Sequence, residues 1–455
     1  MSTYHIPRIM IAGTSSGCGK TTVTCAVMKA LANRGLPVSP FKCGPDYIDP
    51  MFHTQILDTP STNLDSFFFD ENTLRYLLVK NSSDKGISVI EGVMGFYDGL
   101  EFGSERASSC EIARITKTPV ILCVNAKGAA LSLLAAIHGF LTFLSENYIM
   151  GVILNHCSQM SYRSFSHAIL EHFGDQIKVL GYLPHMPECS LESRHLGLIT
   201  AREVADLQEK TNRLSRQAEA TIDLDGILHL ARQADPIDCE PIQFPHFTEK
   251  IRIAAAMDNT FCFYYHDNFD LLREMGAEII PFSPLTDVHL PEAVHGLYLG
   301  GGYPELYTQE LSDNISIKNE IRKLLSSGIP CIAECGGFMY MCRDIEGVSM
   351  TNYFPASSYN NKKLTRFGYV TLEAKQDNLL CKKGEHIAAH EFHYWDCDDP
   401  GTDFLARKPS GREWSCIHAN DHLYAGFPHI HFYTNPKLAE NFYKACLNYK
   451  EKSHA

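Results

Sequence analysis

Two segments of this sequence carry residues whose types and spacing could do chemistry. The first is the glycine-rich segment Gly13-Thr-Ser-Ser-Gly-Cys-Gly-Lys-Thr-Thr22, which lies between an apolar run and a helical pattern. Such a turn can hold phosphate groups, because its backbone N–H groups and the helix N-terminus point towards the anion. The second is Cys335, which follows an apolar run and precedes two glycines. One chain is therefore predicted to hold a nucleotide site and a thiolate nucleophile.

The glycine-rich segment is expected to bind the phosphates of a nucleotide. Lys20 would neutralise the β- and γ-phosphates, and the hydroxyl group of Thr21 would bind Mg²⁺. The glycine that usually opens such a loop is displaced, because Gly13 lies one place early and Thr14 takes its position. An ordinary glycine turn is the alternative, but the succession of strand, loop and helix favours a phosphate loop. The predicted nucleotide-binding residues are Gly17, Gly19, Lys20, Thr21 and Thr22.

Charged residues in two later motifs could complete the nucleotide site. Glu91 ends a predicted buried strand, and strand ends in open α/β sheets deliver side chains to the ligand crevice. Lys42 could bridge a γ-phosphate and an acceptor carboxylate, and carboxylates suit Mg²⁺, which prefers oxygen ligands. Solvated loop charges would explain any one of these residues but explain the whole set poorly. The predicted catalytic residues are Lys42, Asp46, Asp49, Glu91 and Asp98, and the predicted metal ligands are Thr21, Asp46 and Glu91.

Cys335 is expected to be the nucleophile of the second site. Its place at the start of a predicted helix should lower the pKa of the thiol. The N–H of Gly336 would point to a developing oxyanion, and the loop with Gly301 and Gly302 could supply a second donor. His429 is the candidate base, which would activate the thiol and protonate departing ammonia. A buried core cysteine is the alternative for Cys335 alone, but the glycines and His429 disfavour it.

The other histidines are given structural interpretations. His390 and His393 lack the His-Glu-x-x-His spacing of a zinc site, and no paired cysteines accompany them. Scattered histidines such as His53 are interpreted as surface or core residues.

Length and composition favour a globular protein of two domains. The chain has 455 residues, of which 45% are hydrophobic and 20% charged. A formal net charge of −13 disfavours a general nucleic-acid binder. No signal peptide is apparent and no apolar stretch is long enough to span a bilayer, so no membrane association is expected. The sixteen cysteines have no regular spacing, which favours a cytoplasmic protein with reduced thiols.

The alternation of apolar runs and helical patterns predicts a parallel sheet with helices on both faces in the first half, and a similar α/β pattern after a break. Three prolines between residues 236 and 245 mark the break. The expected domains are 1–235 and 250–455, joined by a linker at 236–249. The expected strands are residues 8–12, 87–91, 119–124 and 150–154, then 250–256, 278–281, 296–300 and 329–333, and the helix after the phosphate loop is expected at 21–34.

Taken together, these motifs closely resemble those of the cobyrinate/hydrogenobyrinate a,c-diamide synthase family. The likeness follows the same order over nearly the whole chain. In the first half the matching segments are Gly13 to Thr22, Phe41-Lys-Cys-Gly-Pro-Asp-Tyr47 with Asp49, Asn63-Leu-Asp-Ser66, and Glu91-Gly-Val-Met-Gly95 with Tyr97-Asp-Gly99. In the second half they are Gly300-Gly-Gly-Tyr-Pro-Glu305, Glu334-Cys-Gly-Gly337, Arg366-Phe-Gly-Tyr369, His390-Glu-Phe-His-Tyr394 and His429-Ile-His431.

The resemblance implies an α/β fold of two domains. The N-terminal domain would be a P-loop NTPase-like parallel sheet, similar to dethiobiotin synthetase, and the C-terminal domain would be like a class I glutamine amidotransferase. Amidotransferases of that class usually place a glutamate two residues after the catalytic histidine. Here that position is His431, which cannot supply the same fixed negative charge.

The function that the resemblance implies is the ATP- and glutamine-dependent amidation of the a and c acetate groups of cobyrinic acid, in cobalamin biosynthesis. The N-terminal domain would bind ATP with Mg²⁺ and form acyl phosphates, and Cys335 would release ammonia from L-glutamine. The partner would be a small tetrapyrrole acid, and a homodimer is one possible assembly.

Several alternatives stay open. Relatives with the same motifs act on hydrogenobyrinic acid or nickel-sirohydrochlorin, and nothing in the sequence reports the metal at the ring centre. A positioning ATPase of the septum-site or plasmid-partitioning kind would share the phosphate loop but has no need of Cys335. An amidotransferase domain that serves only as a scaffold is opposed by the presence of both Cys335 and His429.

Overall fold

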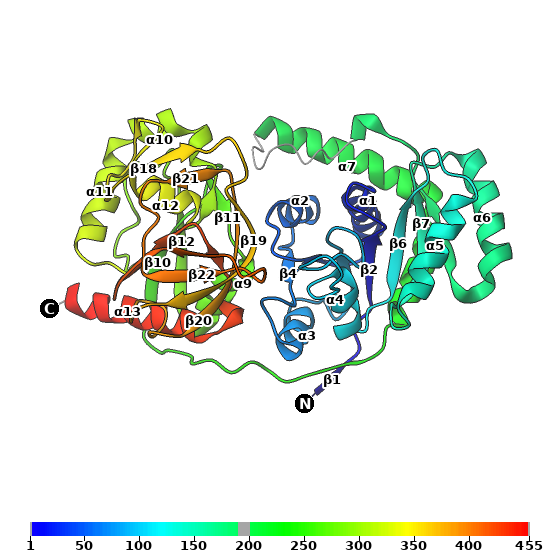
Figure 1. Ribbon diagram of the computed structural model, residues 1–455, viewed down its shortest axis with the longest axis horizontal. Helices are drawn as coiled ribbons and strands as arrows, with labels where there is room; N and C mark the ends of the chain where they lie inside the picture. The colour runs from blue at the N-terminus through cyan, green and yellow to red at the C-terminus, as the bar shows by residue number, and fades with distance from the viewer. Residues whose placement is uncertain (1, 190–200, 454–455) are drawn as a thin grey trace. The chain divides into compact units, whose positions relative to one another are not determined.

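The computed structural model describes residues 2–189 and 201–453 and contains two compact units (Figure 1). The described residues up to Ile242 belong to the first unit, and the second begins at Gln243. Each unit is built around a largely parallel sheet with helices, which confirms the expected α/β fold. Among the described residues, no helix has the length and apolar character needed to cross a membrane.

The first unit has a seven-stranded sheet in the order β4-β3-β5-β2-β6-β7-β8, and every neighbouring pair is parallel. The strands β2 and β5 are buried along their whole length, which explains their continuous apolar sequences. The strands are β2 (Arg8–Gly13), β3 (Val38–Cys43), β4 (Thr62–Leu64), β5 (Ile87–Glu91), β6 (Val120–Asn125), β7 (Ile149–Asn155) and β8 (Lys178–Tyr182).

Helices cover this sheet. Residues of α1, α7 and α8 share one hydrophobic core with Ile9 and Ile11 of β2 and with Ile121 of β6. The helices are α1 (Lys20–Asn33), α2 (Ile48–Leu57), α3 (Glu71–Lys80), α4 (Ser109–Ile115), α5 (Ser132–Phe143), α6 (Gln159–Phe173), α7 (Ala201–Thr221) and α8 (Leu224–Arg232).

Part of the expected linker is a strand of the first unit. Residues of β9 (Ile237–Cys239) pair antiparallel with β1 (Ser2–Tyr4), and Tyr4 lies opposite Ile237. A proline removes one N–H from a ladder, but Pro236 and Pro241 flank β9 and do not interrupt it. The described first unit thus extends into the segment expected to be the linker, and its last residue is Ile242.

The second unit has a six-stranded sheet in the order β12-β10-β13-β15-β25-β24, parallel except for its last pair. The strands are β10 (Ile251–Ala256), β12 (Ala277–Phe282), β13 (Gly296–Leu299), β15 (Cys331–Glu334), β24 (His418–Ala419) and β25 (Leu423–Gly426). The helices are α9 (His266–Met275), α10 (Thr308–Asp313), α11 (Ile315–Ser326), α12 (Gly336–Met341) and α13 (Lys437–Ser453).

A second, antiparallel sheet in this unit was not expected from the sequence. Its order is β23-β22-β19-β20-β26, and His390 of β20 lies opposite His429 of β26. The strands are β19 (Arg366–Ala374), β20 (His386–His393), β22 (Phe404–Arg407), β23 (Glu413–Cys416) and β26 (His429–Ile430). The remaining strands are β11 (Phe261–Phe263), β14 (Gly301–Gly302), β16 (Cys342–Ile345), β17 (Val348–Ser349), β18 (Phe354–Asn360) and β21 (Trp395–Cys397).

The strands expected from the sequence are all present, with ends that differ by one or two residues at most, and the expected helix after the phosphate loop is α1.

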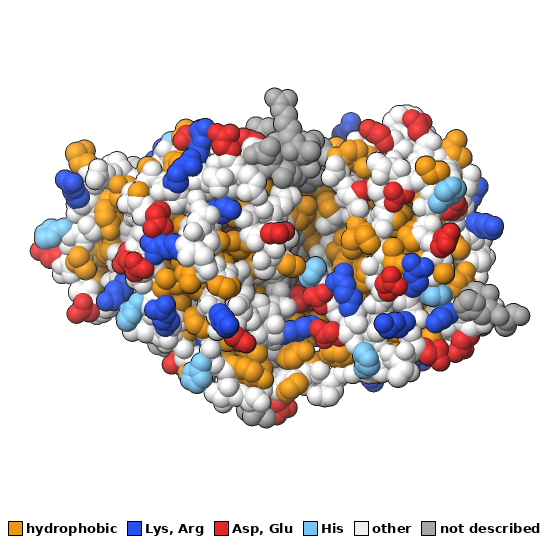
Figure 2. All heavy atoms as spheres, turned by 180° about the vertical axis from the view of Figure 1, so that it is seen from behind, with side chains coloured by type: hydrophobic (Ala, Val, Ile, Leu, Met, Phe, Trp, Pro, Cys, Tyr) orange, Lys and Arg blue, Asp and Glu red, His pale blue; other side chains and the backbone are white. Residues whose placement is uncertain are grey.

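On the face drawn in Figure 2, basic and acidic side chains are interspersed and do not gather into one extended basic stripe.

Candidate functional site

The glycine-rich loop joins β2 to α1, and each of its glycines has either a backbone conformation or a close neighbour that disfavours a side chain. Gly17 and Gly19 have φ angles of 73° and 92°, which side chains rarely tolerate. A Cβ on Gly19 would lie 2.0 Å from Asn155 Nδ2, which itself donates a hydrogen bond of 2.9 Å to the carbonyl of Cys18. A Cβ on Gly13 would lie 2.4 Å from Cys18 Sγ. The displaced glycine is therefore needed for the loop to fold tightly.

A buried polar cluster begins at the first turn of α1. The Thr21 hydroxyl donates a hydrogen bond of 2.6 Å to Glu91 Oε1, at the end of β5. The ammonium group of Lys42, on β3, donates to Asp49 and, at 3.2 Å, to the same Glu91 oxygen. On the other side, His53 Nε2 lies 2.8 Å from Glu91 Oε2. One carboxylate thus joins the loop hydroxyl, a cation and a histidine.

Lys42 and Glu91 support each other's charge, whereas burial and the charge of Glu91 raise the pKa of Asp49 well above its usual value. Burial opposes ionisation of Glu91, but the charge of Lys42 and the hydrogen bonds from His53 and Thr21 outweigh it and hold its pKa below the usual range. Burial likewise opposes the charge of Lys42, but Asp49, Glu91 and Asp46 raise its pKa well above the usual value. Glu91 is therefore a carboxylate, and Lys42 an ammonium, at neutral pH.

The two remaining predicted acids lie at the margin of this cluster or beside it. Asp46 is partly exposed, with Oδ2 3.9 Å from Lys42 Nζ and Oδ1 accepting the N–H of Ile48. Asp98 is exposed and accepts the N–H of Gly95 at 2.8 Å, so it closes its own turn. The structure therefore brings Thr21 and Lys42 together with three of the four predicted acids. These three are Asp46, Asp49 and Glu91.

In the first unit, the sequence interpretation missed His53 as a partner of Glu91. His53 is fully buried, and its Nδ1 lies 3.2 Å from the hydroxyl of Ser61, so both ring nitrogens have partners. A signal was available: His53 follows Asp49 by four positions on α2, and residues four apart share a helix face.

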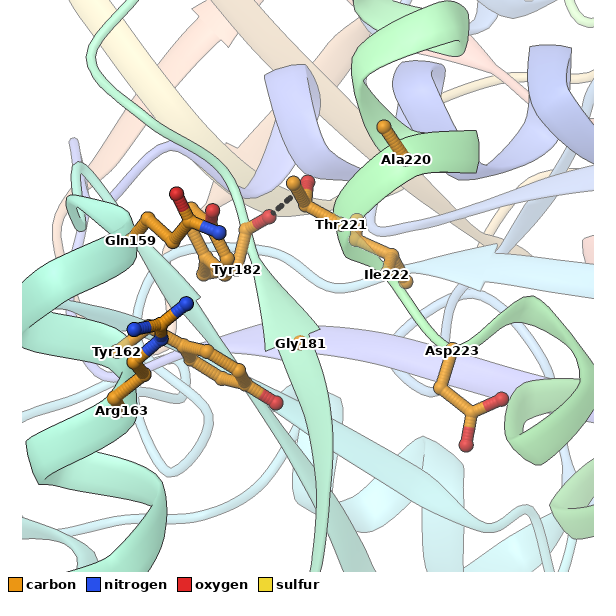
Figure 3. Close-up of a pocket in the computed structure, with 9 residues that line it drawn as sticks. All are labelled: Gln159, Tyr162, Arg163, Gly181, Tyr182, Ala220, Thr221, Ile222 and Asp223. Carbon is orange, nitrogen blue, oxygen red and sulfur yellow. Dashed lines mark hydrogen bonds between the residues drawn. The ribbon is translucent and has the colours of Figure 1, made fainter.

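Two of the cavities lined by described residues lie in the first unit. One, of about 240 Å³, adjoins the end of the phosphate loop and is lined by Thr22, Asn155, His156, His185, Met186 and Leu214 among others. The other, of about 430 Å³, opens beside β8 and contains no predicted site residue (Figure 3). In this second cavity the Thr221 hydroxyl donates a hydrogen bond of 2.7 Å to the carbonyl of Tyr182.

In the second unit, Cys335 forms a sharp elbow between β15 and α12. Its φ of 48° and ψ of −104° are unusual for a residue with a side chain, and its N–H donates to the carbonyl of Gly426 at 2.8 Å. A Cβ on Gly336 would lie 3.0 Å from the backbone nitrogen of Gly302, and one on Gly337 only 2.0 Å from the carbonyl oxygen of Leu299. The two glycines after Cys335 thus let the elbow pack against the predicted oxyanion loop.

The predicted base lies against the same loop. His429 is 3% exposed, and a Cβ on Gly301 would lie 2.5 Å from its Cε1 atom. The predicted residues of the second site, Cys335, Gly336, Gly301, Gly302 and His429, therefore belong to one connected group of backbone and ring contacts. Beside them, burial and the neighbouring His429 and His393 lower the pKa of His390 to about 3.

The expectation of a lowered pKa for Cys335 was wrong. Burial and the charge of Glu305 raise the pKa of this thiol, and the hydrogen bond from the Gly336 N–H does not offset them. The helix that follows has only six residues, so its N-terminus offers little positive potential. Burial also raises the pKa of Glu305 to about 7, against a hydrogen bond from Trp395. The thiol is therefore protonated in this state and depends on a base.

Comparison with known proteins matches both units. Residues 9–199 match the CobQ/CobB/MinD/ParA nucleotide binding domain, and residues 252–437 match the CobB/CobQ-like glutamine amidotransferase domain. Proteins named cobyrinate a,c-diamide synthase are similar over nearly the full length. That of Caldanaerobacter subterraneus subsp. tengcongensis is 40% identical over 452 residues, covering 97% of this chain and 99% of the relative.

Further relatives agree. The proteins of that name from Listeria innocua and Clostridium acetobutylicum are 40% and 41% identical, over 96% and 94% of this chain and 99% and 97% of their own lengths. The resemblance seen in the motifs is thereby confirmed: this chain belongs to the cobyrinate a,c-diamide synthase family.

Proposed function

We propose that this protein forms amides from the a and c acetate carboxylates of cobyrinic acid, with ATP and glutamine, in cobalamin biosynthesis. The observation that carries the proposal is the presence of two built sites in one chain. The first joins a phosphate loop to a buried Thr21–Glu91–Lys42 cluster, and the second is the Cys335 elbow with His429. The names of the relatives supply the substrate.

The first site is suited to ATP. The loop glycines and Lys20 would hold the phosphates, and Lys42 would orient the γ-phosphate and the acceptor carboxylate. We place the nucleoside in the cavity of about 240 Å³ beside Thr22, where apolar Met186 and Leu214 offer a surface for the base. Attack of the substrate carboxylate oxygen on the γ-phosphorus would release ADP and leave an acyl phosphate.

The donor set beside the loop fits Mg²⁺. Thr21 Oγ1 and Glu91 Oε1 are hard oxygen ligands 2.6 Å apart, with Asp46 nearby on the same cluster. In the described part of the chain, no group of three or more His, Cys, Asp or Glu residues is arranged as a complete metal site. Mg²⁺ usually keeps water and phosphate ligands, so Thr21, Asp46 and Glu91 would hold it only together with the nucleotide. The ion would neutralise charge on the transferred phosphoryl group.

The second site is suited to glutamine. His429 would take the proton of Cys335, whose sulfur attacks the glutamine amide carbon while the backbone of Gly336 and of the Gly301–Gly302 loop stabilises the oxyanion. The proton then passes to the departing ammonia, and water hydrolyses the glutamyl thioester. Ammonia attacks the acyl phosphate at the carbonyl carbon, and phosphate leaves as the amide forms.

The test is ADP release by the purified protein with cobyrinic acid, ATP and Mg²⁺. Glutamine or ammonium is supplied to the wild type and to Cys335→Ala. The wild type should use both nitrogen sources and the variant only ammonium. If hydrogenobyrinic acid or nickel-sirohydrochlorin stimulates ADP release and cobyrinic acid does not, the substrate assignment changes to that acid. ATP turnover that depends on neither tetrapyrrole nor nitrogen source would favour a positioning ATPase and overturn the proposal.

A further inference from the structure

We propose that Glu334 is the acidic residue that positions His429 for its action on Cys335. The inference rests on the glutaminase role proposed above for Cys335 and His429. It is drawn from the contacts of the Glu334 side chain with His429 and Ile430 and from the place of His431, two residues after His429.

Glu334 is held beside the histidine by a fixed hydrogen bond. It is the last residue of β15, directly before Cys335, and is 1% exposed. Its Oε1 accepts the N–H of Ile430 at 3.1 Å, and its Oε2 lies 3.6 Å from Nδ1 of His429. One carboxylate therefore faces both residues of β26. A carboxylate that closed on Nδ1 from this distance of 3.6 Å would direct Nε2 outwards as the proton acceptor and stabilise the imidazolium that forms.

A purely structural role explains this carboxylate poorly. A buried carboxylate is costly unless charged or polar partners compensate it. Besides Ile430 and His429, Glu334 interacts electrostatically with Cys335 and with the buried tyrosines Tyr264, Tyr298 and Tyr424. Burial and then the charge of Glu334 raise the pKa of Tyr298 and Tyr424. Among these groups, only His429 would become a cation during the reaction.

His431 has a different task. Its Nδ1 accepts the N–H of Tyr433 at 3.2 Å, so it caps the turn Phe432–Thr434. Its ring packs against Tyr265 with centroids 4.7 Å apart. His431, which occupies the usual position of the acid, thus stabilises the loop after β26. The negative charge comes instead from Glu334, the residue directly before the nucleophile Cys335.

The experiment compares Glu334→Gln, Glu334→Asp and the wild type. Glutamine-dependent and ammonium-dependent ADP formation are measured with the full chain, together with kcat and KM for glutamine. Glu334→Gln should lower the glutamine-dependent kcat at least about 100-fold, because the neutral amide neither fixes the histidine nor stabilises its cation. KM for glutamine should change little, and ammonium-dependent activity should be kept. Glu334→Asp, which retains the charge, should recover part of the loss.

Other results would overturn the inference. Glutamine use within two-fold of wild type in Glu334→Gln would show that the charge is not needed. Equal losses in the Gln and Asp variants, or a loss carried by KM alone, would show a packing role. If Glu334→Gln loses both activities because it misfolds, the Asp variant decides by the same kcat comparison. Cys335→Ala distinguishes failure of this inference from failure of the proposed function. If Cys335→Ala still uses glutamine, the proposed glutaminase role is wrong. If Cys335→Ala loses glutamine use but Glu334→Gln behaves like the wild type, only the inference about Glu334 is wrong.

Discussion

Thr21 and Glu91 lie 70 residues apart in the sequence, yet the hydroxyl of the first donates a 2.6 Å hydrogen bond to the carboxylate of the second. This bond ties the first turn of α1 to the end of the neighbouring strand β5. The phosphate loop is thereby linked to Glu91, and through Glu91 to Lys42 and His53.

Replacement of Glu91 should separate the two activities. Glu91→Gln removes the negative charge that pairs with Lys42, so ADP formation should fall at least about 100-fold with either nitrogen source. Glutamate release from glutamine, measured without ATP, should persist, because Cys335 and His429 belong to the other unit. Loss of glutamate release in a folded Glu91→Gln protein would contradict this assignment.

Lys42 should matter for stability as well as for activity. It is 3% exposed and lies among three carboxylates, so Lys42→Met leaves buried negative charge without compensation. Breaking such a pair typically costs about 3–5 kcal/mol. The free energy of unfolding of the first unit should fall by that order in urea titrations. The double variant Lys42→Met, Asp49→Asn should be less destabilised than the single one, and a more destabilised double variant would count against the electrostatic explanation.

A methyl group on Gly301 should impair only glutamine use. It would lie 2.5 Å from His429 Cε1, so the ring must move away from the loop. Gly301→Ala should therefore lower glutamine-dependent ADP formation about 10-fold or more and leave the ammonium-dependent rate near wild type. Gly139→Ala is a matched control, because a Cβ on Gly139 would have no atom within 4 Å and the φ of Gly139, like that of Gly301, is not positive. Equal effects of the two changes would refute the close contact.

Acid should destabilise the second unit through His390. Its pKa falls from the model-peptide value of 6.5 to about 3 on folding, so the unfolded chain binds this proton at higher pH than the folded one. Stability is therefore lost as the pH falls from about 6.5 towards 3, and is unaffected by this group above that window. The urea midpoint should drop less between pH 7.5 and pH 5 in His390→Gln than in the wild type. If the urea midpoint drops by the same amount in both proteins, the acid sensitivity belongs to other groups.

The sequence predicted what depends on local order along the chain. The phosphate loop and the Cys335 elbow were found because strand, glycine turn and helix follow one another directly. His53 and Glu334 were missed as partners of Glu91 and His429 because those contacts join segments far apart in sequence. The lowered pKa expected for Cys335 failed for a related reason: helix position can be predicted from sequence, but the burial that dominates this thiol cannot.

The pairing of β1 with β9 has a practical consequence. Strand β9, near the end of the first unit, pairs with residues 2–4 in a two-stranded antiparallel sheet. Trimming those residues, or fusing a bulky tag directly onto them, would remove or disturb the partner strand of β9. Strand β1 thus holds β9 in place by pairing with it, and affinity tags are better placed after α13.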